Sequence, residues 1–146
     1  MSSPLVTRPD LPAKKFPIAI IGTGGIVKDA HLPAYRMAGF PVWGLMNRTV
    51  ERAESLAKEF SVERVFGDLA AMVDAAPPDV IYDLALPASM FAGALRTLPE
   101  GSWVLIQKPM GENLEEAREI LRVCRERNLH AAINCQLRYA PFVLAA

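Results

Sequence analysis

The sequence has little of what marks disulfide-stabilised, membrane-spanning or nucleic-acid-binding proteins. Its 146 residues include two cysteines, Cys124 and Cys135, too few for a disulfide framework. No apolar run approaches roughly 18 residues, the length of a membrane-spanning helix, and residues 1–16 lack the apolar core of a signal peptide. Sixteen basic residues balance 16 acidic residues without forming a basic block. These absences favour a cytoplasmic protein without a nucleic-acid or membrane partner.

The residues that are present indicate one globular domain. Hydrophobic residues make up 51% of the chain and charged residues 22%, and a chain of this length buries about 70% of its unfolded surface. Residues 1–15 carry three prolines among polar residues and predict a flexible tail. We expect a single domain over residues 16–136.

Short apolar runs recur along this domain. They lack the strict alternation of half-exposed strands, so they predict strands that are buried on both faces of a parallel sheet. The predicted strands are Ile18–Ile21, Val42–Met46, Val80–Leu86, Trp103–Ile106 and Ala131–Asn134, with Arg64–Phe66 as a short edge strand.

Amphipathic segments separate the strands. Helical spacing of apolar residues predicts helices over residues 51–60 and 114–127, with Thr49 and Asn113 as N-caps. Asp68 is the expected cap of a third, shorter helix. The order of elements predicts an α/β fold, a doubly wound (Rossmann) six-stranded parallel sheet with helices on both faces.

A glycine-rich turn follows the first apolar run. Gly22 and Gly24 have the spacing at which a dinucleotide site needs a tight turn, and then a residue without a side chain where pyrophosphate approaches backbone N–H groups. Alone, this spacing also fits a plain turn between a strand and a helix, but its place in an α/β pattern favours nucleotide binding. We expect contacts from Gly22, Thr23, Gly24, Gly25 and Ile26.

The end of the second strand indicates which dinucleotide is bound. An NAD site usually has Asp or Glu there to bind the ribose hydroxyls, and this chain has Asn47 followed by Arg48. A guanidinium can bind a 2′-phosphate, so NADP is the preferred cofactor and NAD the second choice. The alternative is that Arg48 is a solvated loop residue.

Four segments together resemble the N-terminal half of one oxidoreductase family. The segments "IGTGGIVKDAHLPAY", "YDLALPASM", "LIQKPMGENLEEA" and "LRYAP" are similar to the glucose–fructose oxidoreductase, inositol dehydrogenase and rhizopine-catabolism (Gfo/Idh/MocA) family. The resemblance runs from about residue 17 to the end of the chain. It implies an NAD(P)-dependent oxidoreductase that acts on a sugar, cyclitol or related hydroxyl or carbonyl compound.

The most telling family motif, Glu-Lys-Pro, stands here as Gln107-Lys108-Pro109. The resemblance makes Lys108 the catalytic lysine, and both Lys108 and Gln107 neighbours of the cofactor. Lys108 follows a strand of the parallel sheet, at the edge where ligands bind in such folds. A cation there can stabilise alkoxide character on the substrate. The alternative is an ordinary surface lysine.

Other family positions are matched less fully. Ala85, Leu86 and Pro87 correspond to a segment beside the cofactor, although Leu86 replaces the usual threonine. His31 and Arg138 correspond to positions at the rim of the substrate pocket. Asp83, inside an apolar strand, predicts a buried, hydrogen-bonded carboxylate that holds a neighbouring loop. We expect no metal site.

The family's second domain, with its catalytic histidine, has no counterpart in residues 1–146. Residues 137–146 resemble the start of the crossover into that domain, which often carries an oligomer interface. The chain is then part of a longer enzyme, inactive alone, with a possible homo-oligomer through the second domain. A non-catalytic dinucleotide-binding module, such as a redox sensor, and a domain for another ligand, such as a nucleotide sugar, stay open as alternatives.

Overall fold

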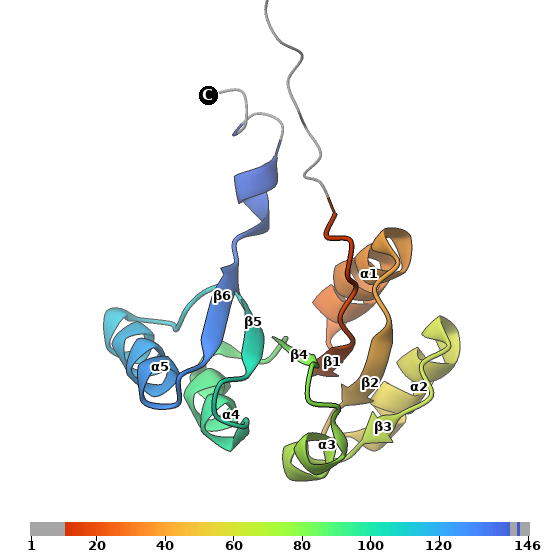
Figure 1. Cartoon of the computed structure of the whole chain (residues 1–146), viewed down its shortest axis with the longest axis horizontal. Coiled ribbons are helices and arrows are strands. Elements are labelled where there is room, and N and C mark those ends of the chain that lie inside the picture. Colours follow the sequence, from red (N-terminus) through yellow and green to blue (C-terminus); the bar gives the residue numbers. More distant parts are fainter. Residues whose placement is uncertain (1–10, 141–142, 144–146) are drawn as a thin grey trace, which may run out of the picture.

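The computed structural model describes residues 11–140 and residue 143, and these residues form a six-stranded sheet (Figure 1). All strands are parallel, in the order β3-β2-β1-β4-β5-β6. The strands are β1 (Ile18–Ile21), β2 (Val42–Met46), β3 (Val65–Phe66), β4 (Ile81–Leu84), β5 (Trp103–Gln107) and β6 (His130–Asn134). The predicted doubly wound fold is confirmed.

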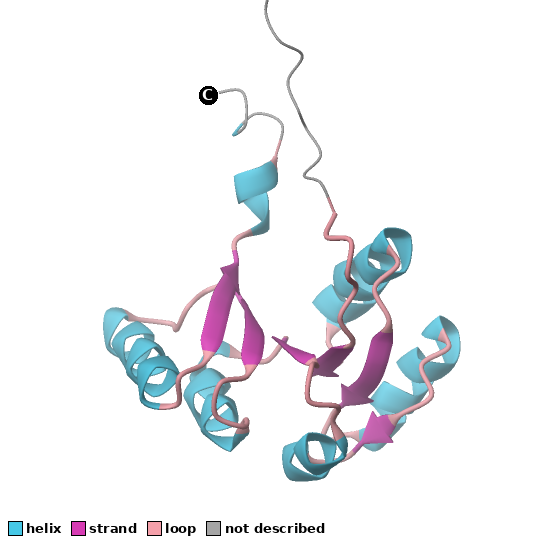
Figure 2. Cartoon of the chain, in the orientation of Figure 1, coloured by secondary structure: helices cyan, strands magenta, loops and turns pink. Residues whose placement is uncertain are grey.

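Helices connect each strand to the next (Figure 2). They are α1 (Leu32–Ala38), α2 (Val50–Phe60), α3 (Leu69–Ala75), α4 (Phe91–Thr97) and α5 (Leu114–Glu126). Shorter turns are the π-helical η1 (Val27–His31), which runs into α1, and the 3₁₀ turns η2 (Ala88–Met90) and η3 (Gln136–Tyr139).

The sheet separates two hydrophobic clusters. Residues of α1 and α2 pack with one set of strand side chains, including Ile18, Ile20 and Leu45, and we call this side the front face. Residues of α3, α4 and α5 pack with the alternate side chains on the back face. Because successive side chains of a strand point to opposite faces, the strand runs are apolar at almost every position.

Boundaries differ from the sequence prediction in four strands. β4 covers only Ile81–Leu84, which excludes Val80 at one end, and at the other end the chain bends at Leu86. β5 extends by one residue, to Gln107. β6 begins at His130, whose N–H donates to the Ser102 carbonyl at 2.9 Å. The short edge strand lies where it was predicted, at one end of the sheet, but β3 covers Val65–Phe66 without Arg64.

The predicted helix caps differ in how they are made. Asp68 and Asn113 accept hydrogen bonds from the N–H groups of Ala71 and Glu116, as expected for N-caps. The Thr49 side chain makes no capping bond, and its N–H donates to Asn47 Oδ1 at 3.1 Å instead. The start of α2 is therefore stabilised by a residue two positions earlier.

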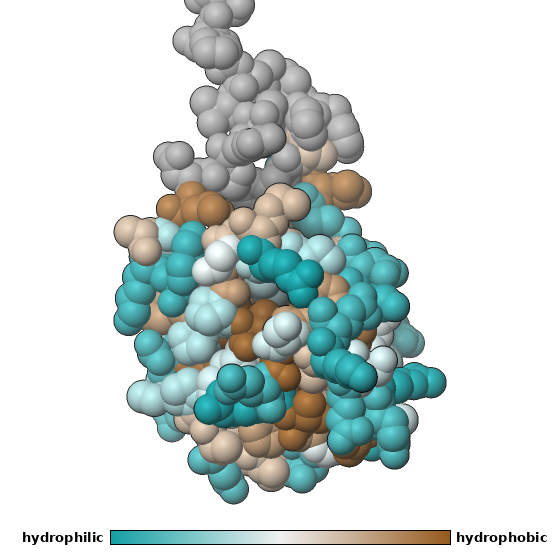
Figure 3. Space-filling model, turned by 90° about the vertical axis from the view of Figure 1, so that its right-hand side faces the viewer, coloured by the Kyte–Doolittle hydropathy of each residue, from teal (hydrophilic) through white to brown (hydrophobic). Residues whose placement is uncertain are grey.

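Residues 11–15 form neither a helix nor a strand, and residues 1–10 of the predicted tail lie outside the described part. Lys14 contacts Asp79 at 3.6 Å, and the ammonium of Lys15 lies 4.7 Å from the Phe40 ring. Within residues 11–140, no helix has the length and apolarity that a membrane crossing needs. Charged and polar residues cover much of the side formed by α1 and α2, with apolar residues visible between them (Figure 3).

Candidate functional site

A cleft of 690 Å³ opens at the carboxyl ends of the strands. It spans the point between β1 and β4 where the strand order reverses, which is where doubly wound sheets bind ligands. Its walls come from the ends of four strands and from α2, α3, η2 and α4. The lining residues are Gly22, Thr23, Gly24, Met46, Asn47, Arg48, Arg52, Gly67, Asp68, Leu69, Ala85, Leu86, Pro87, Ser89, Met90, Gly93, Ala94 and Thr97.

Gly22 makes the tight turn that ends β1. Its φ of 99° lies in the left-handed region, and a Cβ there would stand 2.3 Å from the Ala85 carbonyl oxygen. The turn is fixed to both neighbouring strands, because Gly22 N–H donates to the Met46 carbonyl at 2.8 Å and Ala85 N–H donates to the Ile21 carbonyl at 2.9 Å. Only glycine fits this approach of the turn to the end of β4.

Gly24 faces open space rather than protein. A Cβ on Gly24 would have no atom within 4 Å, and this residue lines the cleft. Its carbonyl accepts hydrogen bonds from the N–H groups of Val27 and Lys28, at 3.0 and 3.2 Å, so the turn leads directly into η1. Gly25 and Ile26, also predicted to touch the cofactor, are exposed beside the cleft and are not among its lining residues.

Asn47 connects the second strand to the glycine turn. Its Nδ2 donates to the hydroxyl of Thr23, which is 8% exposed, and its Oδ1 accepts from Thr49 N–H. Both side-chain atoms of Asn47 are therefore engaged by the protein. The residue lines the cleft as expected, but its amide holds the turn in place.

Two guanidinium groups stand at the β2 end of the cleft. Arg48 was predicted there, and Arg52 lies one helical turn later, on α2. Both side chains are exposed, and neither forms an ion pair with an acid in the described part of the chain. Sequence reasoning missed Arg52, although it lies in the first turn of the predicted helix that follows Arg48. The pair gives this end of the cleft a positive charge.

The opposite wall continues the end of β4. Ala85, Leu86 and Pro87 line it as predicted, and the wall extends along η2 and α4 through Ser89, Met90, Gly93, Ala94 and Thr97. Those five residues were not predicted, because their uncharged side chains gave no chemical signal in the sequence.

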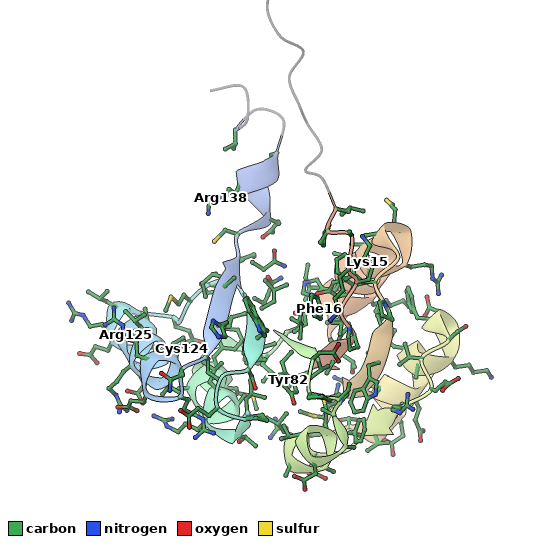
Figure 4. All side chains as sticks on the ribbon, in the orientation of Figure 1. Lys15, Phe16, Tyr82, Cys124, Arg125 and Arg138 are labelled. Atoms are coloured by element: carbon green, nitrogen blue, oxygen red, sulfur yellow. The ribbon has the colours of Figure 1, made fainter. Side chains whose placement is uncertain are left out.

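The predicted catalytic lysine lies outside this cleft. Lys108 is exposed directly after β5, and its N–H donates to Gln107 Oε1 at 3.1 Å. Gln107 is 7% exposed, and neither residue is among those lining the cleft. Arg138 is exposed on η3, beyond the end of β6 (Figure 4). Pro141, part of the same family segment, lies outside the described residues.

His31 does not lie at an open rim as the resemblance implied. His31 is 7% exposed, and its Nδ1 donates to Asp83 Oδ2 at 2.7 Å. The Tyr35 hydroxyl donates to the same oxygen at 2.8 Å. Burial, and then the Asp83 charge, raise the pKa of Tyr35, which keeps the phenol a donor at neutral pH. Asp83 is fully buried, so the predicted hydrogen-bonded carboxylate is present.

These groups fit a dinucleotide. The open side of Gly24 leaves room for a diphosphate at the start of a helical segment, where backbone N–H groups favour negative charge. The arginine pair suits a further phosphate on the adenosine side. No group of three potential metal ligands occurs among the residues that the structure describes.

Comparison with known proteins gives a family match over most of the chain. Residues 16–135 match the Gfo/Idh/MocA family, described as an oxidoreductase family with an NAD-binding Rossmann fold. An uncharacterised oxidoreductase of Escherichia coli is 30% identical over 109 residues, which is 74% of this chain and 33% of that protein. D-apiose dehydrogenase of Paraburkholderia graminis is 28% identical over 134 residues, or 90% of this chain and 35% of that protein.

A solved structure shows the same fold with a cofactor. The 3-ketoreductase KijD10 of Actinomadura kijaniata, in complex with NADP and TDP-benzene, superposes with a TM-score of 0.67 at 28% identity. The match covers 83% of this chain and 37% of that one. The chain thus spans about a third of the length of the curated relatives it matches.

Proposed function

Because this chain belongs to the Gfo/Idh/MocA oxidoreductase family and forms its NAD(P)-binding domain, we propose that the whole protein is a sugar or polyol oxidoreductase. It transfers hydride between a nicotinamide cofactor and a sugar, cyclitol or related hydroxyl or carbonyl compound. The similar D-apiose dehydrogenase and 3-ketoreductase, by their names, support this substrate class.

One observation carries the proposal: the cleft at the strand-order reversal is built from the glycine turn on one side and Ala85–Pro87 on the other. Backbone N–H groups of the glycine turn bind the diphosphate, and Gly24 gives it room. Asn47 contributes indirectly, because it fixes Thr23 and the turn. When bound, the nicotinamide supplies the hydride chemistry.

The preferred cofactor is NADP. Arg48 and Arg52 present two cations at the adenosine end of the cleft, where an NAD site usually has a carboxylate. Asp68 is the acidic residue among those that line the cleft. It already accepts a hydrogen bond from Ala71 N–H at 2.8 Å as the cap of α3.

Lys108 is the proposed catalytic residue. Its ammonium, exposed at the carboxyl end of β5, stabilises developing negative charge on the substrate oxygen or passes a proton to it. A second domain, entered after residue 136, supplies most of the substrate pocket and the interface of a possible homo-oligomer. Cys124 and Cys135 are free, which fits a reducing cytoplasm.

A titration and a turnover assay on the protein at its natural length test this function. Protein fluorescence should give a dissociation constant for NADPH about tenfold below that for NADH, a difference of roughly 1.4 kcal/mol. Sugars and polyols should be oxidised with NADP⁺, or their carbonyl forms reduced with NADPH. Binding without turnover of any such compound would favour a non-catalytic module, and no binding of either cofactor would overturn the proposal.

A further inference from the structure

The buried cluster of His31, Tyr35 and Asp83 has no part in the function proposed above. Asp83 lies on the front face of β4, between Ile20 of β1 and Leu105 of β5 in the strand register. Its two neighbours are apolar, as is usual for a buried sheet, whereas Asp83 is a fully buried carboxylate.

The stability of the fold alone does not account for a buried carboxylate at Asp83. Asp83 Oδ1 and His31 Nε2 are buried and have no hydrogen-bond partner among the described residues. Such atoms are destabilising, and an apolar residue of similar size often serves a buried position as well as an ion pair does. The cluster instead fixes the orientation of His31 and Tyr35, because a hydrogen bond determines the direction of its donor and an apolar contact does not.

The cluster fixes the helical segment that follows the glycine turn. His31 ends the π-helical turn η1, and Tyr35 lies four residues later on α1, so both donate from one helical face to the same oxygen. The Gly24 carbonyl accepts from Lys28 N–H, and Val27 O accepts from Leu32 N–H. The glycine turn and η1 therefore form one continuous hydrogen-bonded segment. A π-helical turn of this kind is often found at functional sites.

Asp83 also connects this segment to the opposite wall of the cleft. Asp83 lies two residues before Ala85, whose carbonyl oxygen approaches Gly22 so closely that no Cβ fits between them. A contact between Asp83 and η1 thus joins the turn that carries the diphosphate-binding N–H groups to the strand that continues into the Ala85–Pro87 wall.

We infer that Asp83 and His31 are positioning residues for the dinucleotide, which hold the glycine turn at a fixed distance and angle from the β4 wall. This inference rests on the proposed function, because it assumes that a dinucleotide diphosphate binds at the turn. Neither residue touches the ligand. Tyr35 supports them by completing the hydrogen bonds to Asp83.

Two ligands separate positioning from a general loosening of the fold. NADPH uses the whole cleft, whereas adenosine 2′-monophosphate has no 5′-phosphate and depends on the arginine end alone. In the protein at its natural length, Asp83→Asn should weaken NADPH binding about tenfold. The same substitution should leave the dissociation constant for adenosine 2′-monophosphate within twofold.

Tyr35→Phe removes one donor without changing the shape of the core, and it should show the same pattern with a smaller loss of NADPH affinity. If the Asp83→Asn protein does not fold, Tyr35→Phe takes its place in the test. Tyr82→Phe is the matched control, because Tyr82 is a buried tyrosine beside Asp83 that faces the back of the sheet (Figure 4). It should change neither dissociation constant.

Equal losses for both ligands, or no loss for either, would overturn the inference. These outcomes differ from failure of the proposed function, in which the unsubstituted protein itself would not bind NADPH.

Discussion

Helices cover the two halves of the sheet to different extents. Around β1, β2 and β3, helices cover both faces, and the described residues complete one end of a cleft. At β5 and β6, α4 and α5 cover the back, and no helix of the described part covers the front. There Trp103 is 59% exposed and stacks on His130 with ring centroids 4.4 Å apart.

Under the proposed function, this difference separates the part of the sheet that binds the cofactor from the part that carries the catalytic residue. The residues that line the cleft, where we propose that adenosine and diphosphate bind, all lie between Gly22 and Thr97. Among the described residues, no helix covers the front face of the half that carries Lys108, whereas parallel sheets are usually covered on both faces. We therefore expect binding to depend on local residues of this chain, and catalysis to depend on a further part of the protein.

The largest effect should come from Lys108. In the protein at its natural length, Lys108→Met should lower kcat about 100- to 1,000-fold, the loss typical when a group that stabilises transition-state charge is removed. The NADPH dissociation constant should stay within twofold, because Lys108 lies outside the cleft. Lys58→Met, on an exposed lysine of α2, is the control. A kcat within twofold of the unsubstituted enzyme would remove Lys108 from the chemistry.

Alanine substitutions at Gly22 and Gly24 should separate effects on folding from effects on binding. Gly22→Ala should lower the free energy of unfolding by about 3 kcal/mol, from the positive φ and the contact with Ala85. Gly24→Ala should change stability by less than about 0.5 kcal/mol and still weaken NADPH binding, because its Cβ points into open space on the cleft wall. Thermal unfolding and titration of both variants measure this contrast. Equal stability losses would mean that the turn is packed differently.

A smaller effect should appear at the adenosine end. Arg48→Gln or Arg52→Gln should weaken NADPH binding about tenfold, because each removes a cation facing the 2′-phosphate. Binding of NADH should change less than twofold. Arg118→Gln, on an exposed arginine of α5, should affect neither cofactor. If NADPH and NADH lost affinity together, the arginines would not determine cofactor choice.

The smallest effect should be at the open front face. In the 146-residue chain, Trp103→Thr should change the free energy of unfolding by no more than about 0.5 kcal/mol, because the side chain is mostly exposed. In the protein at its natural length the same substitution should cost more, if another segment covers this face. Met37→Thr, at an 89% exposed methionine of α1, should be neutral in both. A neutral Trp103→Thr in both would show that the face stays open.

Sequence reasoning worked where local chemistry determines the structure. Apolar runs located the six strands, and the glycine spacing located the turn, because Gly22 occupies a conformation that only glycine adopts easily. Arg48 and Ala85–Pro87 were placed on the cleft wall. Each of these residues follows a strand end, so the sheet topology alone brings them together.

The remaining features depend on pairs that are distant in sequence. The contact of His31 with Asp83 joins residues 52 positions apart, and nothing in either local pattern indicated it. The hydrogen bond from Asn47 to Thr23 likewise joins residues 24 positions apart, so neither local pattern indicated it.

A crystal structure with bound NADP⁺ tests the central claim most directly. Diphosphate oxygens should lie within about 3.2 Å of backbone nitrogens of the glycine turn, with the 2′-phosphate beside Arg48 and Arg52. A cofactor bound elsewhere on the protein, or a cleft that stays empty at saturating NADP⁺, would contradict the account.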